Sequence, residues 1–418
     1  MANSEQALAA PANISWQHKT CRQIMLKIFA SLPQGNLIIK EQGVLVESFG
    51  DKHSDLHAEI NVLSPQLYQR LLFGGSIASG ETYAEGLWTT PNLTNVIRIF
   101  ARNLDMLDNW ESKMEWLALP VRKIMHFARR NSSQGAKKNI AAHYDLGNNL
   151  YRHFLDSSML YSAAIYPSAE TTLAEAQLTK LTAICDKLQL KPQDHLIEIG
   201  TGWGGLAVFA AKNYGCKVTT TTISEEQHQY ASEWIKREGL QDQITLLKQD
   251  YRLLTGKYDK LVSIEMIEAV GRQYLPTFFK KCSDLLKDQG LMVLQAITIS
   301  DQRLERYSKN VDFIQKHIFP GGFLPSQLLI NQHLSQYTNM LIRDLHDIGL
   351  DYAKTLQDWH AKFIQNKDAI QQAGYDEGFM KMWRYYFSYC EGGFLERTIS
   401  TVQLVITKPA CHLPMMGR

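Results

Sequence analysis

A run of glycines between residues 198 and 205 is the part of the sequence that most clearly indicates chemistry. It reads Glu-Ile-Gly-Thr-Gly-Trp-Gly-Gly and overlaps a short apolar segment, 196–199, that is typical of a strand. Glycines after a first strand let the backbone turn tightly and approach a bound nucleotide, with the N-terminus of the next helix alongside. Gly200, Gly202 and Gly205 also satisfy G-x-G-x-x-G, a weak motif alone, so a nicotinamide or flavin site must be weighed against S-adenosylmethionine (SAM).

Two features of this region favour SAM over a dinucleotide. Glu198 stands two places before the first glycine, where a carboxylate can meet the cationic methionine end of SAM. The second expected strand, 217–222, does not end in the acidic residue that binds a ribose in dinucleotide-binding folds. The nearest acidic residues fall inside the next expected helix, 225–237, where Ser224 and Gln227 are predicted to form a capping box.

The segments after about residue 130 alternate between strand and helix patterns. Apolar or β-branched runs predict strands at 196–199, 217–222, 244–247, 260–264 and 291–294, and helical patterns lie between them, for example 225–237 and 275–286. Such alternation predicts a parallel sheet covered by helices on both faces.

The chain before that point has a shorter and more mixed pattern. Strands are predicted at 36–39 and 44–46, joined by a turn at 41–43. Glycines then precede an aromatic stretch, 83–88, for which we favour a core interpretation over a lipid-contacting surface.

A chain of 418 residues is too long for one ordinary core. We therefore predict two domains, 1–130 and 131–418. A segment from Arg122 to Lys138 is basic and contains no acidic residue. Such a segment is usually a solvated linker, and the alternative is a patch that meets anionic lipid headgroups.

The bulk composition limits the environment and the partners. The net charge of +2 demands no nucleic-acid partner, and the six cysteines show neither a CxxC pair nor metal-ligand spacing, so no metal site is expected. The sequence shows no signal peptide and no run of 18 apolar residues. A cytoplasmic protein is the expectation, and one that handles lipid would visit the membrane from outside the bilayer.

Several further motifs occur together with the glycine run, and in this order the set resembles one family. In order they are His143–Gly147, Tyr161-Ser162, Glu198–Gly205, Thr222–Gln227, Glu268–Gly271 and Ile318–Gly322. The chain resembles the cyclopropane-fatty-acid synthase family of SAM-dependent methyltransferases. Residues 80–88 are similar to the amino-terminal domain of its full-length bacterial members, and residues 385–394 to their carboxy-terminal helix.

The resemblance implies a fold and a cofactor site. The expected fold is α/β: a Rossmann-like class I SAM-dependent methyltransferase domain with a mixed seven-stranded sheet, preceded by a smaller α/β lipid-binding domain like sterol carrier proteins. The residues expected at the SAM pocket are Tyr161, Ser162, Glu198, Gly200, Gly202, Gly204, Thr222, Gln227, Asp250 and Tyr251. Asp250 is expected to accept a hydrogen bond from the adenine amine. Taken singly, Tyr161 reads as core packing, Thr222 as a strand former and Asp250 as a loop cap.

The implied chemistry is attack of a carbon–carbon double bond on the methyl group of a sulfonium. This leaves positive charge on the acyl chain, which a carboxylate and aromatic faces can stabilise. Glu268, after the fourth strand, is the candidate carboxylate, and Tyr352 the candidate aromatic. The plain alternatives are a helix-start acid for Glu268 and core packing for Tyr352.

Removal of a proton is where this sequence departs from the family. The resemblance implies a bicarbonate base held at five positions, of which Glu268, Tyr352 and Ile297 match, whereas the usual cysteine is Ala163 and the usual histidine is Gln295. Three accounts stay open. Bicarbonate still binds and a cyclopropane forms; another base gives a methyl-branched or methylene product; or the substrate is a conjugated diene, whose allylic cation is more stable and needs less stabilisation by the protein.

The leading interpretation is methyl or methylene transfer to the double bond of an unsaturated acyl chain in a membrane phospholipid. The resemblance adds peripheral contact with the inner face of the membrane and a homodimer. The alternative within this class is methyl branching of an unsaturated or diene chain without ring closure. A methyltransferase for a soluble acceptor would need no lipid-handling domain, and a SAM- or lipid-binding protein without catalysis would bind SAM without turnover.

Overall fold

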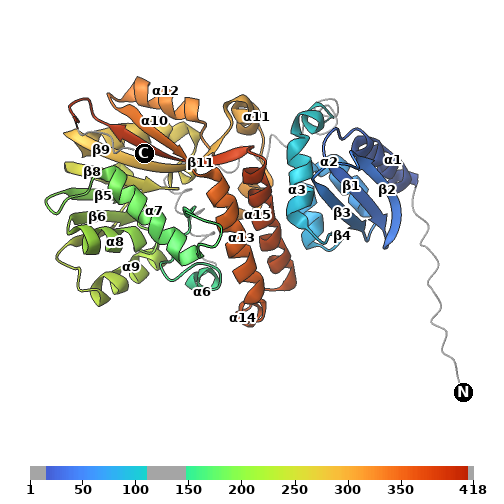
Figure 1. Cartoon of the computed structure of the whole chain (residues 1–418), viewed down its shortest axis with the longest axis horizontal. Helices are drawn as coiled ribbons and strands as arrows, with labels where there is room; N and C mark the ends of the chain where they lie inside the picture. The colour runs from blue at the N-terminus through green and yellow to red at the C-terminus, as the bar shows by residue number, and fades with distance from the viewer. Residues whose placement is uncertain (1–15, 111–146, 413–418) are drawn as a thin grey trace, which may run out of the picture. The chain divides into compact units, whose positions relative to one another are not determined.

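The computed structural model of the chain describes residues 16–110 and 147–412 (Figure 1). These residues belong to two compact units, Met1–Ala118 and Leu119–Arg418. The predicted boundary at residue 130 and the basic segment from Arg122 to Lys138 lie outside the described residues. No helix of the described ranges is long and apolar enough to cross a bilayer.

The smaller unit is an α/β structure around a four-stranded sheet with the order β2-β1-β3-β4. Its elements are α1 (Trp16–Ala30), β1 (Asn36–Glu41), β2 (Val44–Gly50), β3 (His57–Val62), α2 (Gln66–Ala84), β4 (Trp88–Thr89) and α3 (Leu93–Arg102). The predicted strands and turn are confirmed. Gln42 and Gly43 have φ of 50° and 82°, as a two-residue hairpin turn of type I′ requires.

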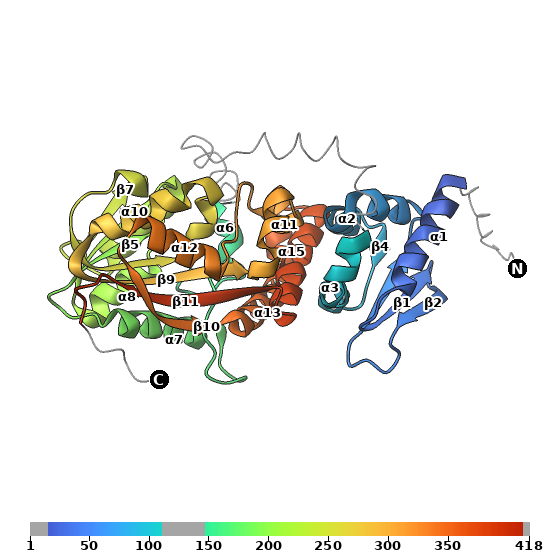
Figure 2. The same cartoon turned by 90° about the horizontal axis from the view of Figure 1, so that it is seen from above.

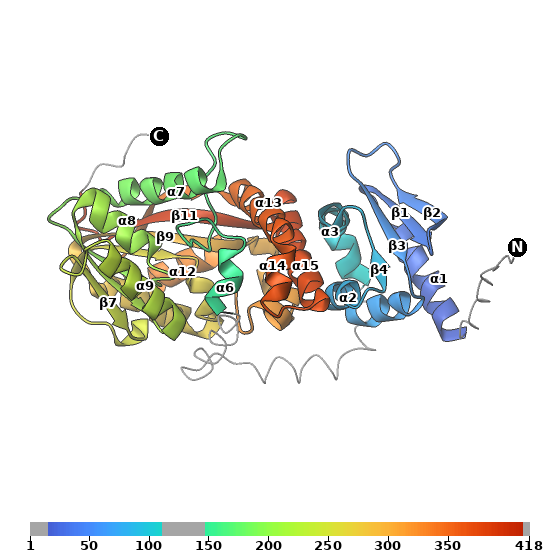
Figure 3. The same cartoon turned by 90° about the horizontal axis from the view of Figure 1, so that it is seen from below.

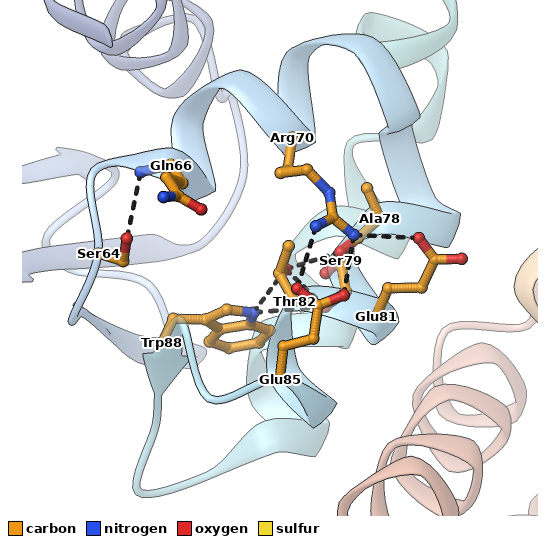
Figure 4. A network of polar contacts seen from close by, with 9 residues as sticks. All are labelled: Ser64, Gln66, Arg70, Ala78, Ser79, Glu81, Thr82, Glu85 and Trp88. Atoms are coloured by element: carbon orange, nitrogen blue, oxygen red, sulfur yellow. Dashed lines mark hydrogen bonds and ion pairs between the residues drawn. The ribbon is translucent and has the colours of Figure 1, made fainter. Parts of the chain in front are cut away.

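The aromatic stretch of the smaller unit contributes to its core, as the sequence indicated. Tyr83 and Trp88 are 6% and 2% exposed, and their ring centroids lie 5.1 Å apart. The Trp88 indole donates hydrogen bonds to the Thr82 hydroxyl at 3.2 Å and to the Ser79 carbonyl at 3.3 Å (Figure 4). On the same helix, the Arg70 guanidinium pairs with Glu81 and Glu85 (Figure 4). These contacts join α2 to β4.

The larger unit contains the predicted mixed sheet of seven strands, in the order β10-β11-β9-β8-β5-β6-β7 (Figure 2). The strands are β5 (His195–Ile199), β6 (Lys217–Thr222), β7 (Ile244–Lys248), β8 (Tyr258–Ile264), β9 (Leu286–Ile299), β10 (Leu341–Asp347) and β11 (Ile399–Thr407). The pairs among β5 to β9 are parallel, and β11 runs antiparallel to both β9 and β10. The five strands predicted from the sequence are confirmed.

Helices cover both faces of this sheet, because alternate strand residues bury to opposite sides. Ile197 and Ile199 join a core with α10 (Leu275–Leu285) and α12 (Gln327–Tyr337), whereas Leu196 joins a second core with α7, α8 and α9 (Figure 1). The bounds of the last three are Leu173–Leu188, Gly205–Tyr214 and Glu225–Arg237. The remaining elements are α6 (Gly147–Arg152), α11 (Leu304–Lys309), α13 (Gly349–Gln365), α14 (Lys367–Gln372), α15 (Glu377–Leu395) and short helical turns at 251–253, 267–269, 272–274, 301–303 and 314–318.

Two long helices, α13 and α15, belong to the carboxyl-terminal part of the larger unit. α13 packs against α15 and against β11 (Figure 3).

In the sheet, Gln295 of β9 pairs with Ile264 at the end of β8 on one side and with Gln403 of β11 on the other. The register therefore brings chain segments more than 100 residues apart to one point at the carboxyl edge of β8, where ligands gather in folds of this kind.

Candidate active site

The glycine run forms the turn from β5 into α8. Gly200 and Gly204 have φ of 104° and 98°, a region that residues with a Cβ rarely adopt. A Cβ on Gly200 would lie 3.1 Å from Cγ of Met266, and one on Gly204 would lie 3.1 Å from Cβ of Ala231. The run therefore needs glycine both for its backbone conformation and for close packing. The short distance from Gly200 to Met266 also places the run beside the segment that follows β8.

Glu198 is buried on β5, two residues before the turn, with 3% of its surface exposed. Its carboxylate accepts a hydrogen bond of 2.5 Å from the hydroxyl of Thr220, which lies opposite it on β6 and is also 2.7 Å from the hydroxyl of Thr201. Burial raises the pKa of Glu198 to about 8 and the bond from Thr220 lowers it less. A positively charged ligand beside this group would draw it into its ionised form.

The end of β6 holds Thr222 and Gln227 together. The Thr222 hydroxyl donates to Oε1 of Gln227 at 2.9 Å and accepts from the backbone N–H of Ser224 at 3.1 Å. Ser224 caps α9 by accepting from the backbone N–H of Gln227 at 3.3 Å. The predicted capping box is therefore wrong in one half, since Thr222 takes both the Ser224 N–H and the Gln227 side chain that would have closed the box.

Asp250 follows β7 and uses both carboxylate oxygens near its own backbone. Oδ1 accepts from the N–H of Arg252 at 2.9 Å, and the Arg252 guanidinium binds Oδ1 at 2.9 Å and Oδ2 at 2.6 Å. This is the loop-capping arrangement that the sequence also allowed. Tyr251 packs edge-on against Phe278 with centroids 5.7 Å apart. The contacts of Asp250 and Tyr251 with SAM stay predictions.

Tyr161 and Ser162 lie in the segment between α6 and α7. The Tyr161 hydroxyl lies 2.8 Å from that of Tyr386 on α15. Ser162 accepts a 2.7 Å hydrogen bond from the ammonium of Lys180, a residue of α7 with no exposed surface. Burial lowers the pKa of Lys180 to about 8, against the attraction of Glu265 and Asp156. Sequence reasoning missed Lys180 and Tyr386.

Aromatic rings surround Tyr161. Its ring centroid lies 5.2 Å from Trp359 and 6.3 Å from Phe319, which belongs to the Ile318–Gly322 motif. Tyr352 of α13 stacks on Phe394 with centroids 4.6 Å apart and meets Trp359 edge-on at 6.0 Å. These rings form an apolar, polarisable surface of the kind that stabilises a cation.

Glu268 lies in the short turn after β8, and its two oxygens differ. Oε1 accepts from the backbone N–H of Ile297 at 2.5 Å, whereas Oε2 is buried with no hydrogen-bond partner among the described residues. Burial, and then the negative charge of Glu265, raise the pKa of Glu268 to about 8. The predicted proximity of Glu268 and Ile297 is therefore present in the structure.

The remaining three residues expected at this centre meet a carboxylate that sequence reasoning missed. Glu265 accepts from the backbone N–H of Ala163 at 2.9 Å, from Nε2 of Gln295 at 2.8 Å and from the Tyr352 hydroxyl at 2.9 Å. Its φ of 47° is left-handed, a conformation that costs about 1–2 kcal/mol in a residue with a side chain. A strained backbone that aims a carboxylate at these donors indicates a functional residue.

A bicarbonate ion does not fit the donors that the resemblance assigns to it. The N–H of Ala163, the amide of Gln295 and the Tyr352 hydroxyl already bond to Glu265. Ile297 bonds to Glu268. SAM, in contrast, fits the glycine turn and the buried Glu198. The sequence did contain a signal for Glu265, since it directly follows a strand of a parallel sheet and Glu268 comes three residues later.

Comparisons with known proteins identify the family. Residues 131–404 match the family model described as mycolic acid cyclopropane synthetase. The chain is 37% identical to the cyclopropane-fatty-acyl-phospholipid synthase of Escherichia coli over 84% of this chain and 88% of that one. It is 35% identical to the tuberculostearic acid methyltransferase of Mycobacterium tuberculosis over 82% of this chain and 81% of that one.

The solved structures give the same result for the fold. A cyclopropane synthase of Mycobacterium tuberculosis, MmaA2, has a TM-score of 0.61 at 25% identity and covers 65% of this chain and 98% of its own. The mycolic acid cyclopropane synthase CmaA1, in complex with SAH and CTAB, has a TM-score of 0.61 at 27% identity and covers the same shares.

One of the motifs that carry the family resemblance, His143–Gly147, is only partly described by the structure. Its residues 143–146 lie outside the described residues.

Proposed function

Since the chain belongs to the mycolic acid cyclopropane synthetase family, whose cofactor is SAM, we propose that it transfers a methyl group from SAM to the double bond of an unsaturated phospholipid acyl chain and closes a cyclopropane ring. One observation carries this proposal. Gly200 of the glycine turn lies so near Met266 that a Cβ there would be 3.1 Å from Cγ of Met266, and Met266 lies between the carboxylates Glu265 and Glu268 in the sequence. A cofactor held by the turn is thereby next to groups that stabilise positive charge and accept a proton.

The residues of the site divide the work of such a reaction. SAM, when bound, supplies a methyl group on a positively charged sulfur. Glu198 balances the charge of the methionine end, and the glycine turn lets the backbone approach the cofactor. The rings of Tyr161, Trp359 and Phe319 exclude water from the acyl chain and stabilise the positive charge that develops on it.

Methyl branching without ring closure is not favoured. It was considered because Ala163 and Gln295 replace two of the groups expected to hold a base. In the structure both residues still donate hydrogen bonds, and they donate them to a carboxylate. The two replacements therefore do not leave the centre without a proton acceptor, so they give no ground for preferring branching over ring closure.

We further propose that the smaller unit brings the protein to its lipid at the membrane surface. The match to the phospholipid synthase covers 84% of the chain, more than residues 119–418 alone can supply, so it includes part of this unit. Val44 and Leu45, beside the hairpin turn, are 70% and 61% exposed, as expected of apolar side chains that enter a lipid interface. Flotation with anionic vesicles should weaken in a Val44→Ser/Leu45→Ser variant and not in Leu328→Ser, a control 53% exposed in the other unit.

The reaction is tested with purified protein, SAM carrying a labelled methyl group, and two vesicle preparations that differ only in having monounsaturated or saturated chains. The expected result is label in the unsaturated chains alone, with a cyclopropane ring found by mass spectrometry. Label in a branched, ring-free chain would replace ring closure with methyl branching. Label in neither preparation, by a protein that binds SAM, would contradict the proposed substrate class.

A further inference from the structure

Glu265 occupies the donors that related enzymes, by the resemblance described above, give to an external anion. A carboxylate and a bicarbonate ion share a planar pair of oxygens with one negative charge. The N–H of Ala163 and the amide of Gln295 meet Oε1 of Glu265 at 2.9 and 2.8 Å, and the Tyr352 hydroxyl meets Oε2 at 2.9 Å. Both oxygens are therefore anchored.

A chain of hydrogen bonds fixes which end of the Gln295 amide faces Glu265. The ammonium of Lys187 can only donate, and it donates to Oε1 of Gln403 at 2.5 Å. The NH2 group of Gln403 therefore faces Gln295 and donates to its Oε1 at 2.9 Å. Gln295, which has no exposed surface, is left with its own NH2 group toward Glu265. The amide that replaces the usual histidine is thus held as a permanent donor.

The charges nearby indicate which of the two carboxylates is ionised. Burial raises the pKa of Glu265, and the hydrogen bonds from Gln295, Ala163 and Tyr352 and the charge of the buried Lys180 ammonium act against that shift, in favour of the charged form. Burial, and then the negative field of Glu265, raise the pKa of Glu268, which receives one hydrogen bond and has an oxygen without a partner among the described residues, so its neutral form is favoured.

We propose that Glu265 is a built-in base, a side-chain carboxylate that accepts the proton in place of bicarbonate. After the double bond has taken the methyl group, the adjacent acyl carbon is electron-deficient. The C–H electron pair of the new methyl group then forms the third bond of the ring. The proton passes to an oxygen of Glu265, which becomes a neutral acid, so charge and atoms balance. This assignment rests on the proposed function, because it names the base of that same reaction.

The test replaces Glu265 with glycine and supplies the missing anion from solution. Glycine tolerates the φ of 47° and leaves the three donors free. In bicarbonate-depleted buffer, wild-type protein should show its full rate of methyl transfer to unsaturated vesicles. Glu265→Gly should lose at least about 100-fold and regain at least about tenfold on addition of bicarbonate or formate. Gln189→Gly, a glycine gain at φ 50° in the cap after α7, is the matched control and should keep the wild-type rate.

Binding of ¹³C-labelled bicarbonate, followed by NMR line broadening, is the second readout and needs no turnover. Broadening by Glu265→Gly but not by wild-type protein shows that Glu265 fills the anion position, and it does so even in preparations where no lipid is methylated, so that failure of the proposed function is told apart from failure of this inference. Saturable broadening by the wild-type protein, with a rate that bicarbonate stimulates, would overturn it. A Glu265→Gly variant that is active at the wild-type rate without added anion would overturn it as well.

Discussion

Glu198, on β5, and Glu265, directly after the neighbouring parallel strand β8, are buried and half-buried glutamates whose surroundings differ. Among the residues that the structure describes, Glu198 has a single side-chain donor, Thr220, and burial raises the pKa of Glu198 to about 8. Glu265 receives hydrogen bonds from the backbone of Ala163 and the side chains of Gln295 and Tyr352. The first carboxyl group has an environment that a cationic ligand would complete. The second already has the donors that a carboxylate needs.

This contrast teaches that donor number, rather than residue type or depth, separates the two roles. A buried carboxyl group with few donors favours its neutral form until an opposite charge arrives. In one with several donors, these donors oppose the effect of burial and stabilise the charged form before any ligand arrives, so it can accept a proton when the reaction releases one. We therefore assign ligand binding to Glu198 and proton acceptance to Glu265.

The largest expected effect is on catalysis by Glu265→Gln. An amide of the same shape cannot accept the proton, so the rate of methyl transfer should fall by about 10²- to 10⁴-fold. SAM affinity measured by calorimetry should stay unchanged, because Glu265 is not among the residues predicted to bind the cofactor. Glu305→Gln removes an exposed carboxylate that pairs only with its helix neighbour Lys309 in the described structure, and is the matched control. A large loss of SAM affinity in Glu265→Gln would show that Glu265 also contributes to cofactor binding, and would contradict the division of roles between Glu198 and Glu265.

Glu198→Gln should act in the opposite way. Loss of a charged partner should weaken SAM binding by about 30-fold, since a hydrogen bond to a charged group contributes about 2 kcal/mol. Wild-type protein should also release close to one proton on binding SAM at neutral pH, because the pKa of Glu198, about 8 without ligand, must fall when the cationic cofactor binds. Calorimetry in buffers of different ionisation enthalpy measures this release. Proton release that persists in Glu198→Gln would assign it to another group.

The stability of the ligand-free protein should fall as the pH rises. Glu198 and Glu268 have folded pKa values of about 8, above the unfolded value near 4.3, so the folded state binds more protons between these limits. Each group then lowers the free energy of unfolding by up to about 1.4 kcal/mol per pH unit across that window. Thermal unfolding from pH 5 to 8 should show the decline, with a shallower slope in Glu198→Gln. An identical slope in the variant would contradict the assignment.

Tyr352→Phe removes one donor from Glu265 and keeps the ring that stacks on Phe394. The rate should fall about tenfold, as expected for a lost hydrogen bond of about 1.4 kcal/mol, while the melting temperature changes little. The pH–rate profile is the decisive readout. With a donor gone, its acid limb should move to higher pH, since the basic form of Glu265 is less stabilised. A profile that does not move would make Tyr352 a packing residue only.

The smallest effect is expected for Lys187→Met, which ends the chain of hydrogen bonds through Gln403 and Gln295. The Gln295 amide can then rotate and lose its contact with Glu265, so the rate should fall about two- to fivefold at constant SAM affinity. Lys280→Met breaks an exposed ion pair on α10 and serves as the control. Equal rates in both variants would show that the orientation of the Gln295 amide does not depend on the ammonium of Lys187.

The sequence predicted the fold and the cofactor turn well because their signals are local. The strands β5 to β8 and helix α9 follow from short apolar runs and from a cap at Ser224. The glycine turn follows from spacing alone. The core interpretation of the aromatic stretch holds for Trp88, which is 2% exposed and whose indole N–H bonds to Thr82 and Ser79.

The proton-accepting centre could not be predicted in the same way because it depends on register. Ala163, Glu265, Gln295 and Tyr352 come from separate segments and meet only when β8 and β9 pair in one particular alignment. In the sequence, Ala163 and Gln295 look like lost ligands. Their backbone and amide donors become meaningful only beside the carboxylate of Glu265, which no motif contains.

Deuterium counting in bicarbonate-depleted buffer tests the central assignment most directly. Wild-type protein receives SAM with a fully deuterated methyl group and vesicles of monounsaturated phospholipid, and mass spectrometry counts the deuterium in the products. We expect rapid formation of a cyclopropane chain that retains two of the three deuterium atoms, the third having passed to Glu265, at a rate that added bicarbonate leaves unchanged. A product that retains all three, or a rate that rises steeply with bicarbonate, would contradict Glu265 as the base for ring closure.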